Sequence, residues 1–264
     1  MRLALQFITA IFCYPMLAAT SAHADGIAKK CETIVYSANP QYPPYHWLTD
    51  GRLEGASVEL LGKLRPDGVK LKPAVYPWKR VLLMAEHGEI DLVLSLRRTP
   101  ERSAFLAFTD GPSFPNPIVV FARADLKFPY QQWSDLKGKR GLISLGDKFG
   151  GGFDEYWPKE LMIQESGTMD ENFQRLKDGQ VDYFITSQFA GAALLNSPKG
   201  RAGRPITHLL PPISDEGVYF GFSKKSPCAS LITQFDQKLS VLAKQYELGP
   251  ILSRYLVERQ PERK

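Results

Sequence analysis

One short sequence motif, a helix end followed by a glycine and a strand, occurs once in each half of this chain. It restricts the possible fold more than any other feature. In each copy a helical pattern ends at a glycine, and a hydrophobic–Asp pair then opens an apolar strand. The first copy is Glu86–Leu92 and the second is Lys177–Tyr183. Glycine readily adopts the left-handed conformation that ends helices. A chance recurrence is the alternative, but two copies favour two halves of similar architecture.

The rest of the chain alternates between strand-like and helix-like segments, which predicts an α/β fold with mostly parallel sheets. β-branched and aromatic residues identify the strands, and apolar spacing identifies the helices. The expected strands are Thr33–Ser37, Val69–Val75, Ile90–Leu94, Pro117–Arg123, Gly141–Ser144, Leu161–Gln164, Val181–Thr186 and Val218–Phe222. The expected helices are Val58–Leu64, Trp78–His87, Asp170–Lys177, Gln188–Leu195 and an amphipathic helix bearing Leu231, Phe235, Leu239 and Leu242 on one face.

The first residues predict export. A basic Met1-Arg2 start, a mostly apolar stretch from Leu3 to Leu17 and the small residues of Ala22-His23-Ala24 are typical of a signal peptide. We expect residues 1–24 to be removed, giving a periplasmic chain that begins near Asp25; a single N-terminal anchor helix is the alternative. Cleavage lowers the formal net charge from +5 to +4, because Arg2 is the only charged residue removed. The remaining charges are interleaved, which gives no support to nucleic-acid binding.

Two cysteines, Cys31 and Cys228, remain after cleavage. An even pair in an oxidising compartment favours a disulfide, and two separate buried thiols are the alternative. The histidines His46, His87 and His208 are scattered, and none has the cysteine–histidine spacing of a zinc site. We therefore expect neither a metal nor another cofactor.

Residues 97–110 supply the main functional signal. They follow the apolar run Ile90–Leu94 and form a basic turn that contains Thr99 and Pro100. Open α/β sheets bind ligands at the carboxyl ends of their parallel strands. An arginine there offers a planar fork that suits a carboxylate, although a solvated surface arginine is the alternative.

From about Thr33 to Val257 the chain resembles the family 3 solute-binding proteins, the extracytoplasmic receptors of polar amino acid ABC transporters. The resemblance rests on the order of four motifs, Asn39–Tyr45, Gly88–Asp91, Thr99–Arg102 with Phe108–Asp110, and Asp135–Lys139. It implies a type II periplasmic-binding-protein fold, in which two α/β lobes are joined by two hinge strands, here Ile118–Ala122 and Val218–Phe222. Lobe 1 would comprise residues 25–121 and 218–264, and lobe 2 would comprise residues 122–217.

The resemblance also implies a ligand site between the lobes. Arg102 matches the arginine that clamps the ligand's α-carboxylate, and Tyr42 and Trp78 match the aromatic residues that sandwich its side chain. Packing within lobe 1 is the alternative for both aromatics. Ser95 matches a position that hydrogen-bonds the ligand. In lobe 2, the resemblance implies carboxylate contacts from the loop of Asp147, Lys148 and Phe149, at a helix N-terminus.

Three positions depart from the family pattern. Ser187 replaces the acid that usually pairs with the ligand's ammonium group, and Asn39 is neutral where receptors for basic amino acids sense a cation. Arg97 stands where a small hydroxyl residue is usual. We therefore expect anionic ligands to be preferred over cationic ones, unless Asp147 or Glu216 replaces the missing acid.

The resemblance implies a monomeric binding protein rather than an enzyme, with a small carboxylate-bearing ligand and an ABC permease as partners. Two alternatives share the fold. One is a periplasmic enzyme similar to cyclohexadienyl dehydratase, with Asp147, Asp154 or Glu216 as general acid. The other is a receptor that reports its ligand to a membrane signalling partner.

Overall fold

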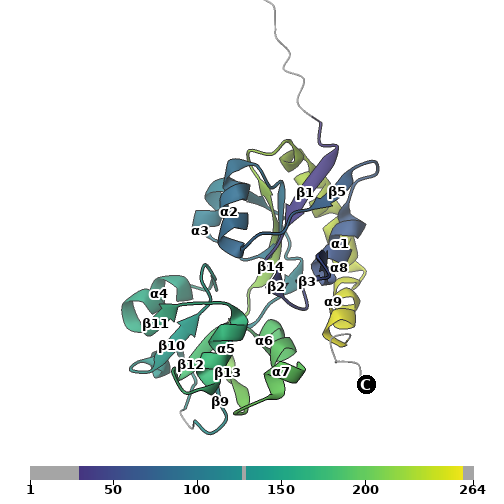
Figure 1. Cartoon of the computed structure of the whole chain (residues 1–264). Helices are drawn as coiled ribbons and strands as arrows, with labels where there is room; N and C mark the ends of the chain where they lie inside the picture. Colours follow the sequence, from purple (N-terminus) through teal and green to yellow (C-terminus); the bar gives the residue numbers. More distant parts are fainter. Residues whose placement is uncertain (1–29, 127–128, 258–264) are drawn as a thin grey trace, which may run out of the picture.

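The computed structural model describes residues 30–126 and 129–257, and it divides the chain into two α/β lobes, each built on its own mixed sheet (Figure 1). The expected signal peptide, residues 1–24, lies outside the described residues. Among the helices that are described, none has the length and apolar character needed to cross a bilayer.

Lobe 1 is built on a sheet in the order β5-β1-β6-β14-β7, with β8 also pairing with β14. Strands β5, β1 and β6 are parallel, whereas β14 runs antiparallel to its neighbours. The strands β5, β1, β6 and β7 share one direction, as expected of a mostly parallel sheet, and β14 runs against them because the chain returns late and in the opposite direction. The bounds are β1 Thr33–Ser37, β5 Lys70–Pro73, β6 Leu92–Leu96, β7 Leu106–Phe108, β8 Phe114–Pro115 and β14 Gly217–Ser223.

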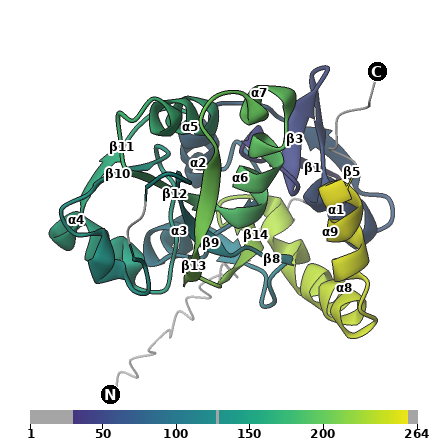
Figure 2. The ribbon, with the colours of Figure 1, turned by 90° about the horizontal axis from the view of Figure 1, so that it is seen from below.

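Helices cover both faces of this sheet. Leu60 of α1, Phe235 of α8 and Leu252 of α9 pack in one core cluster with the strands, while Val81 and Ala85 of α2 pack in another. Figures 1 and 2 both place α8 and α9 together, at the end of the molecule away from α4. The bounds are α1 Ala56–Leu64, α2 Trp78–His87, α3 Pro100–Phe105, η2 Pro227–Leu231, α8 Ile232–Lys244 and α9 Leu248–Val257.

A small antiparallel sheet projects from lobe 1 toward the other lobe. Its strands follow in the order β2-β3-β4, with Tyr42 opposite His46. Pro43 and Pro44 lie in the turn between β2 and β3. The bounds are β2 Gln41–Tyr42, β3 His46–Thr49 and β4 Arg52–Glu54.

Lobe 2 has a sheet in the order β11-β10-β12-β9-β13, in which β9 runs against the other four strands. Alternate residues of β9 face opposite cores, so Val120 packs with Phe153 while Phe121 packs with Phe173. The strands are β9 Ile118–Arg123, β10 Arg140–Ile143, β11 Met162–Glu165, β12 Tyr183–Ser187 and β13 Ile206–Ser214. The helices are η1 Trp133–Leu136, α4 Phe153–Glu160, α5 Met169–Lys177, α6 Gln188–Leu195 and α7 Pro198–Arg201.

The chain crosses between the sheets twice, from β8 to β9 and from β13 to β14. The residues of the two expected hinge strands therefore belong to β9 in lobe 2 and to β14 in lobe 1. The crossings themselves are short, and they lie around Asn116 and Glu216. The expected lobe boundaries at residues 121 and 217 stay a prediction.

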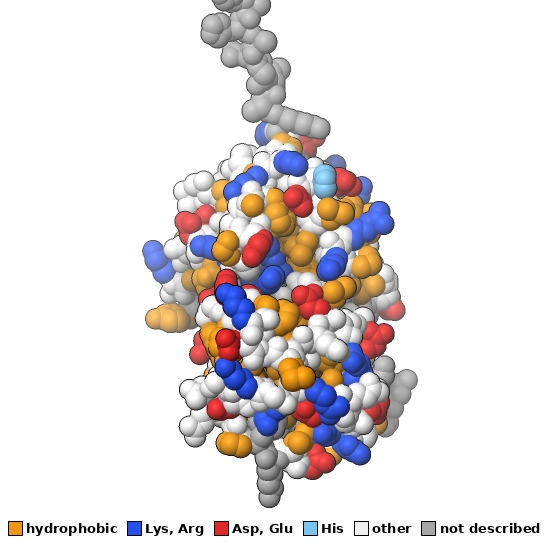
Figure 3. Space-filling view, turned by 90° about the vertical axis from the view of Figure 1, so that its left-hand side faces the viewer, with side chains coloured by type: hydrophobic (Ala, Val, Ile, Leu, Met, Phe, Trp, Pro, Cys, Tyr) orange, Lys and Arg blue, Asp and Glu red, His pale blue; other side chains and the backbone are white. Residues whose placement is uncertain are grey.

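Three expectations about local structure hold. Gly88 ends α2 with a φ of 82°, and Gly179 follows α5 with a φ of 77°. Cys31 and Cys228 form a disulfide that ties the segment before β1 to η2. On the face in Figure 3, acidic and basic side chains are interspersed among apolar ones rather than gathered into a field of one sign.

Candidate functional site

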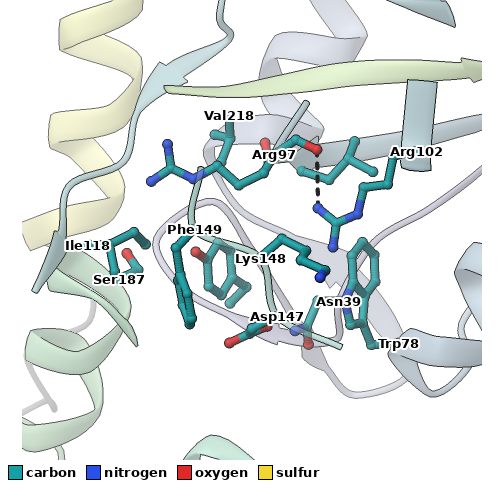
Figure 4. A pocket seen from close by; sticks show the side chains of 13 residues that line it. Asn39, Trp78, Arg97, Arg102, Ile118, Asp147, Lys148, Phe149, Ser187 and Val218 are labelled. Atoms are coloured by element: carbon teal, nitrogen blue, oxygen red, sulfur yellow. Dashed lines mark hydrogen bonds between the residues drawn. The ribbon is translucent and has the colours of Figure 1, made fainter. Parts of the chain in front are cut away.

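All ten sequence-predicted site residues line a single cavity of about 30 Å³ between the lobes. Figure 4 shows residues from both lobes around it. A volume of this size corresponds to about one water molecule, so the lobes are nearly closed on the site. The lining residues are Asn39, Tyr42, Trp78, Ser95, Leu96, Arg97, Arg102, Ile118, Asp147, Lys148, Phe149, Ser187 and Val218.

Local structure fixes the position of Arg102. Thr99 is the N-cap of α3 and accepts a hydrogen bond from the Arg102 backbone N–H, while Pro100 begins the helix. The guanidinium is buried and lies 5.5 Å from the ring centroid of Trp78. Burial lowers the pKa of Arg102 to about 10, against the opposing influence of Asp147. The side chain remains a cation at physiological pH.

The two terminal nitrogens of Arg102 donate to different lobes. Nη1 donates to the Arg97 carbonyl at 3.1 Å, within lobe 1. Nη2 donates to the Gly146 carbonyl at 3.1 Å, and Gly146 lies in the loop between β10 and α4 of lobe 2. Arg102 is therefore a direct hydrogen-bonded link across the cleft.

Aromatic and hydroxyl side chains of lobe 1 form one wall. The Tyr42 ring stacks on Tyr45 with centroids 5.4 Å apart, and its hydroxyl accepts a hydrogen bond from Asn116 Nδ2 at 2.8 Å. A hydrogen bond with Ser187 links the same hydroxyl to lobe 2, and burial raises the pKa of Tyr42 to about 12. The hydroxyl of Ser95 is paired with that of Ser57 at the end of β6. This hydrogen bond restrains the rotation of the Ser95 side chain.

Arg97 differs from the expectation that it supplies free donors to an anion. Its guanidinium points away from Arg102 in Figure 4. Nη1 donates to the carbonyls of Glu216 and Gly217, and Nη2 donates to the carbonyl of Asn116. These carbonyls belong to the two crossings, so both terminal nitrogens are engaged at the hinge. Arg97 contributes charge near the cavity, while its hydrogen bonds fasten the crossings to lobe 1.

In lobe 2, the loop before α4 is held by Asp154. Its carboxylate accepts hydrogen bonds from the backbone N–H groups of Phe149 at 3.0 Å and Gly150 at 2.9 Å. Two of the amides that could receive a ligand carboxylate are thus engaged. Phe149 is buried in the lobe 2 core, and Ser187 caps α6 by accepting from the Ala190 N–H.

A second and much larger cavity of about 810 Å³ opens outward from the same region. It shares Asn39, Tyr42, Trp78 and Asp147 with the inner cavity, so the two cavities adjoin. Its remaining lining is mainly apolar and aromatic, and includes Pro43, Trp47, Val75, Tyr76, Leu145, Met169 and Leu194. A ligand anchored inside therefore has room to extend outward.

Sequence reasoning missed Asn116, the residue that joins the site to the hinge. Its side chain donates to Tyr42, and its carbonyl accepts from Arg97. The available signal was its position between Pro115 and Pro117, which restricts the backbone at the first crossing. Within the ranges that the structure describes, no group of three or more His, Cys, Asp or Glu side chains could hold a metal ion.

The two lobes thus meet at a cavity lined from both sides, where the buried Arg102 donates from lobe 1 to lobe 2. The family model of bacterial extracellular solute-binding proteins, family 3, matches residues 34–258. The chain belongs to this family.

Solved structures share the fold at low sequence identity. An amino acid ABC transporter substrate-binding protein from Streptococcus pneumoniae bound to L-arginine, AbpA, is 19% identical with a TM-score of 0.72, over 88% of this chain and 97% of that one. A histidine kinase sensor domain with similarity to periplasmic binding proteins is 20% identical with a TM-score of 0.72, over 86% and 97%. A mutant of ArgBP from T. maritima is 19% identical with a TM-score of 0.70, over 85% and 95%. A search of curated proteins found no match.

Proposed function

We propose that this protein is a periplasmic receptor that captures a small carboxylate-bearing solute, an amino acid or a related acid, and delivers it to an ABC permease. The observation that carries the proposal is Arg102, a buried cation whose Nη2 reaches across the cleft to the Gly146 carbonyl. A ligand carboxylate would replace this neutral acceptor with a charged one. Bidentate pairing of arginine with a carboxylate is strong and geometrically selective.

Binding would be coupled to lobe closure. A ligand held by Arg102 in lobe 1 and by the loop around Asp147 in lobe 2 makes all its contacts only when the lobes are together. Such a ligand shifts the population toward the closed form, which a permease can recognise. The inner cavity of about 30 Å³ is too small for an amino acid, so the lobes must separate slightly to admit one.

The test is a thermal-shift screen of amino acids and organic acids, followed by calorimetric titration of the best ligand. Arg102→Ala should cost at least ~3 kcal/mol of binding free energy, which is more than a hundredfold in Kd, because a buried carboxylate loses its partner. Arg102→Lys should recover only part of this loss, since an ammonium lacks the planar fork. The exposed Arg52→Ala is the matched control. Unchanged affinity in Arg102→Ala would contradict the proposal.

Signalling without transport uses the same binding chemistry and stays an alternative. A histidine kinase sensor domain has the same fold. Gene neighbourhood separates the two, because a permease and an ATPase beside the gene favour transport, and a sensor kinase favours signalling.

One observation favours an enzyme as the second candidate. Burial, together with nearby Glu165 and Asp154, raises the pKa of Asp147 to about 7 against the effect of Arg102. A carboxyl group that titrates near neutral pH is suited to general acid catalysis. Absorbance assays with prephenate and arogenate test this candidate. Turnover that disappears in Asp147→Asn would establish it.

A further inference from the structure

Ser187 leaves the site without its usual acid, and the structure distinguishes among the three carboxylates that could replace it. Asp154 is engaged with the backbone N–H groups of Phe149 and Gly150. Glu216 accepts a hydrogen bond from the Gly151 N–H at 2.8 Å, and its other oxygen lies 4.0 Å from Nη1 of Arg97. Both carboxylates already have positively polarised partners, and neither lines the inner cavity.

Asp147 is different, because it lines both the inner and the outer cavity. Its backbone N–H is used in a turn with the Ser144 carbonyl at 3.0 Å, which fixes the loop. Its carboxylate accepts no hydrogen bond from any residue that the structure describes. Figure 4 shows it across the cavity from Arg102, which belongs to the opposite lobe. The cleft thus presents one cationic and one anionic group from facing walls.

The surroundings of Asp147 explain why it needs a cationic partner. Arg102 of α3 is the cation that lowers its pKa, while Glu165 of β11, Asp154 of α4 and burial raise that pKa to about 7. The other charged or titratable groups that line the two cavities are Tyr42, Tyr76, Lys79, Arg97, Lys148 and Asp170. Arg97 is fastened at the hinge, and Lys148 faces Asp154 and Glu101, whose pKa values it lowers.

We propose that Asp147 receives the ammonium group of the ligand, so that the cleft selects zwitterionic amino acids over the corresponding acids without an amine. This inference rests on the proposed function, because it takes the ligand's carboxylate to be held by Arg102. The two charges of the ligand then meet opposite charges on opposite lobes. Only the closed form satisfies both, and the side chain extends into the outer cavity.

The experiment compares matched pairs by thermal shift and calorimetry: L-glutamate with glutarate, L-leucine with isocaproate, and L-phenylalanine with hydrocinnamate. We expect at least one amino acid to bind at least tenfold more tightly than its amine-free partner at pH 8. Its affinity should fall about tenfold between pH 8 and pH 6, because protonation of a carboxyl group with a pKa near 7 competes with the ammonium. Asp147→Asn should remove both the preference and the pH dependence, whereas the exposed Asp67→Asn should keep both.

Failure of the inference is distinct from failure of the proposed function. Binding of amine-free acids as tightly as amino acids, or affinity that rises toward pH 6, would overturn the role of Asp147 while leaving a carboxylate receptor in place. Asp147→Asn that folds and binds an amino acid with native affinity would do the same. No response of the native protein to any member of the three pairs would count against both proposals.

Discussion

Arg97 provides the sharpest test of how the two lobes are connected. Its buried guanidinium donates to three backbone carbonyls, those of Asn116 at the first crossing and of Glu216 and Gly217 at the second. One side chain therefore joins both crossings to the end of β6. Replacing Arg97 with Met keeps most of the apolar stem and removes every one of these hydrogen bonds.

The magnitude follows from the contacts. A hydrogen bond to a charged group contributes about 1.5–3 kcal/mol, and the cost of burying the guanidinium offsets part of this gain. Arg97→Met leaves the carbonyls of Asn116, Glu216 and Gly217 without this donor, at about 1–3 kcal/mol for each carbonyl that stays buried and unsatisfied, while loss of the buried charge offsets part of the cost. For a chain of this size each kcal/mol lowers Tm by roughly 2–4 °C. We therefore expect Arg97→Met to lower Tm by roughly 10 °C.

Scanning calorimetry of the protein without ligand measures this change. The exposed Arg52→Met is the control and should stay within about 0.5 kcal/mol of the native protein. An Arg97→Met variant that unfolds at the native temperature would contradict this role of Arg97. An unchanged Tm together with a selective loss of acidic ligands would instead show that the guanidinium serves the cavity.

Three further changes test other parts of the structure. Replacing Cys31 and Cys228 with Ser should lower the free energy of unfolding by up to ~5 kcal/mol in urea titration, because the disulfide spans 197 residues; an unchanged midpoint would contradict this. Trp78→Leu should remove most of the ligand-induced change in tryptophan fluorescence, and a persisting change would place the reporting residue elsewhere. Raising the pH from 5 to 8 should lower the Tm of the native apo protein relative to Asp147→Asn, because the native state holds the Asp147 proton up to about pH 7 and the unfolded chain releases it near its ordinary pKa. A Tm difference independent of pH would contradict the pKa.

Strands and helices with a regular apolar pattern could be predicted from the sequence. The predicted strand Thr33–Ser37 and helix Trp78–His87 have the bounds that the structure gives them. Strand β13 was not predicted because Pro211 and Pro212 interrupt it, and proline removes a ladder donor. The sheet order explains its presence, since β13 is an edge strand with only β9 as a neighbour.

The site was predictable where a residue's role follows from its local turn, and less so where the role depends on distant segments. Arg102 is placed by the Thr99 cap and Pro100, both visible in the sequence. The direction of the Arg97 side chain depends on carbonyls at residues 116 and 216, which only the tertiary fold brings together. The same holds for Asp147. Its carboxylate differs from those of Asp154 and Glu216 because these two accept backbone hydrogen bonds, and the tertiary fold sets those contacts.

The position of β14 constrains the order in which this chain can complete its two sheets. Strand β14 lies between β6 and β7 in the middle of the lobe 1 sheet, and its residues come after the whole of lobe 2. Lobe 2 is one continuous stretch and can complete its own sheet first. Until residues 217–223 are in place, β7 has no neighbour in the described sheet and Cys31 has no disulfide partner. Lobe 1 is therefore completed after lobe 2, and the Cys31–Cys228 disulfide can form only once the chain has returned to lobe 1.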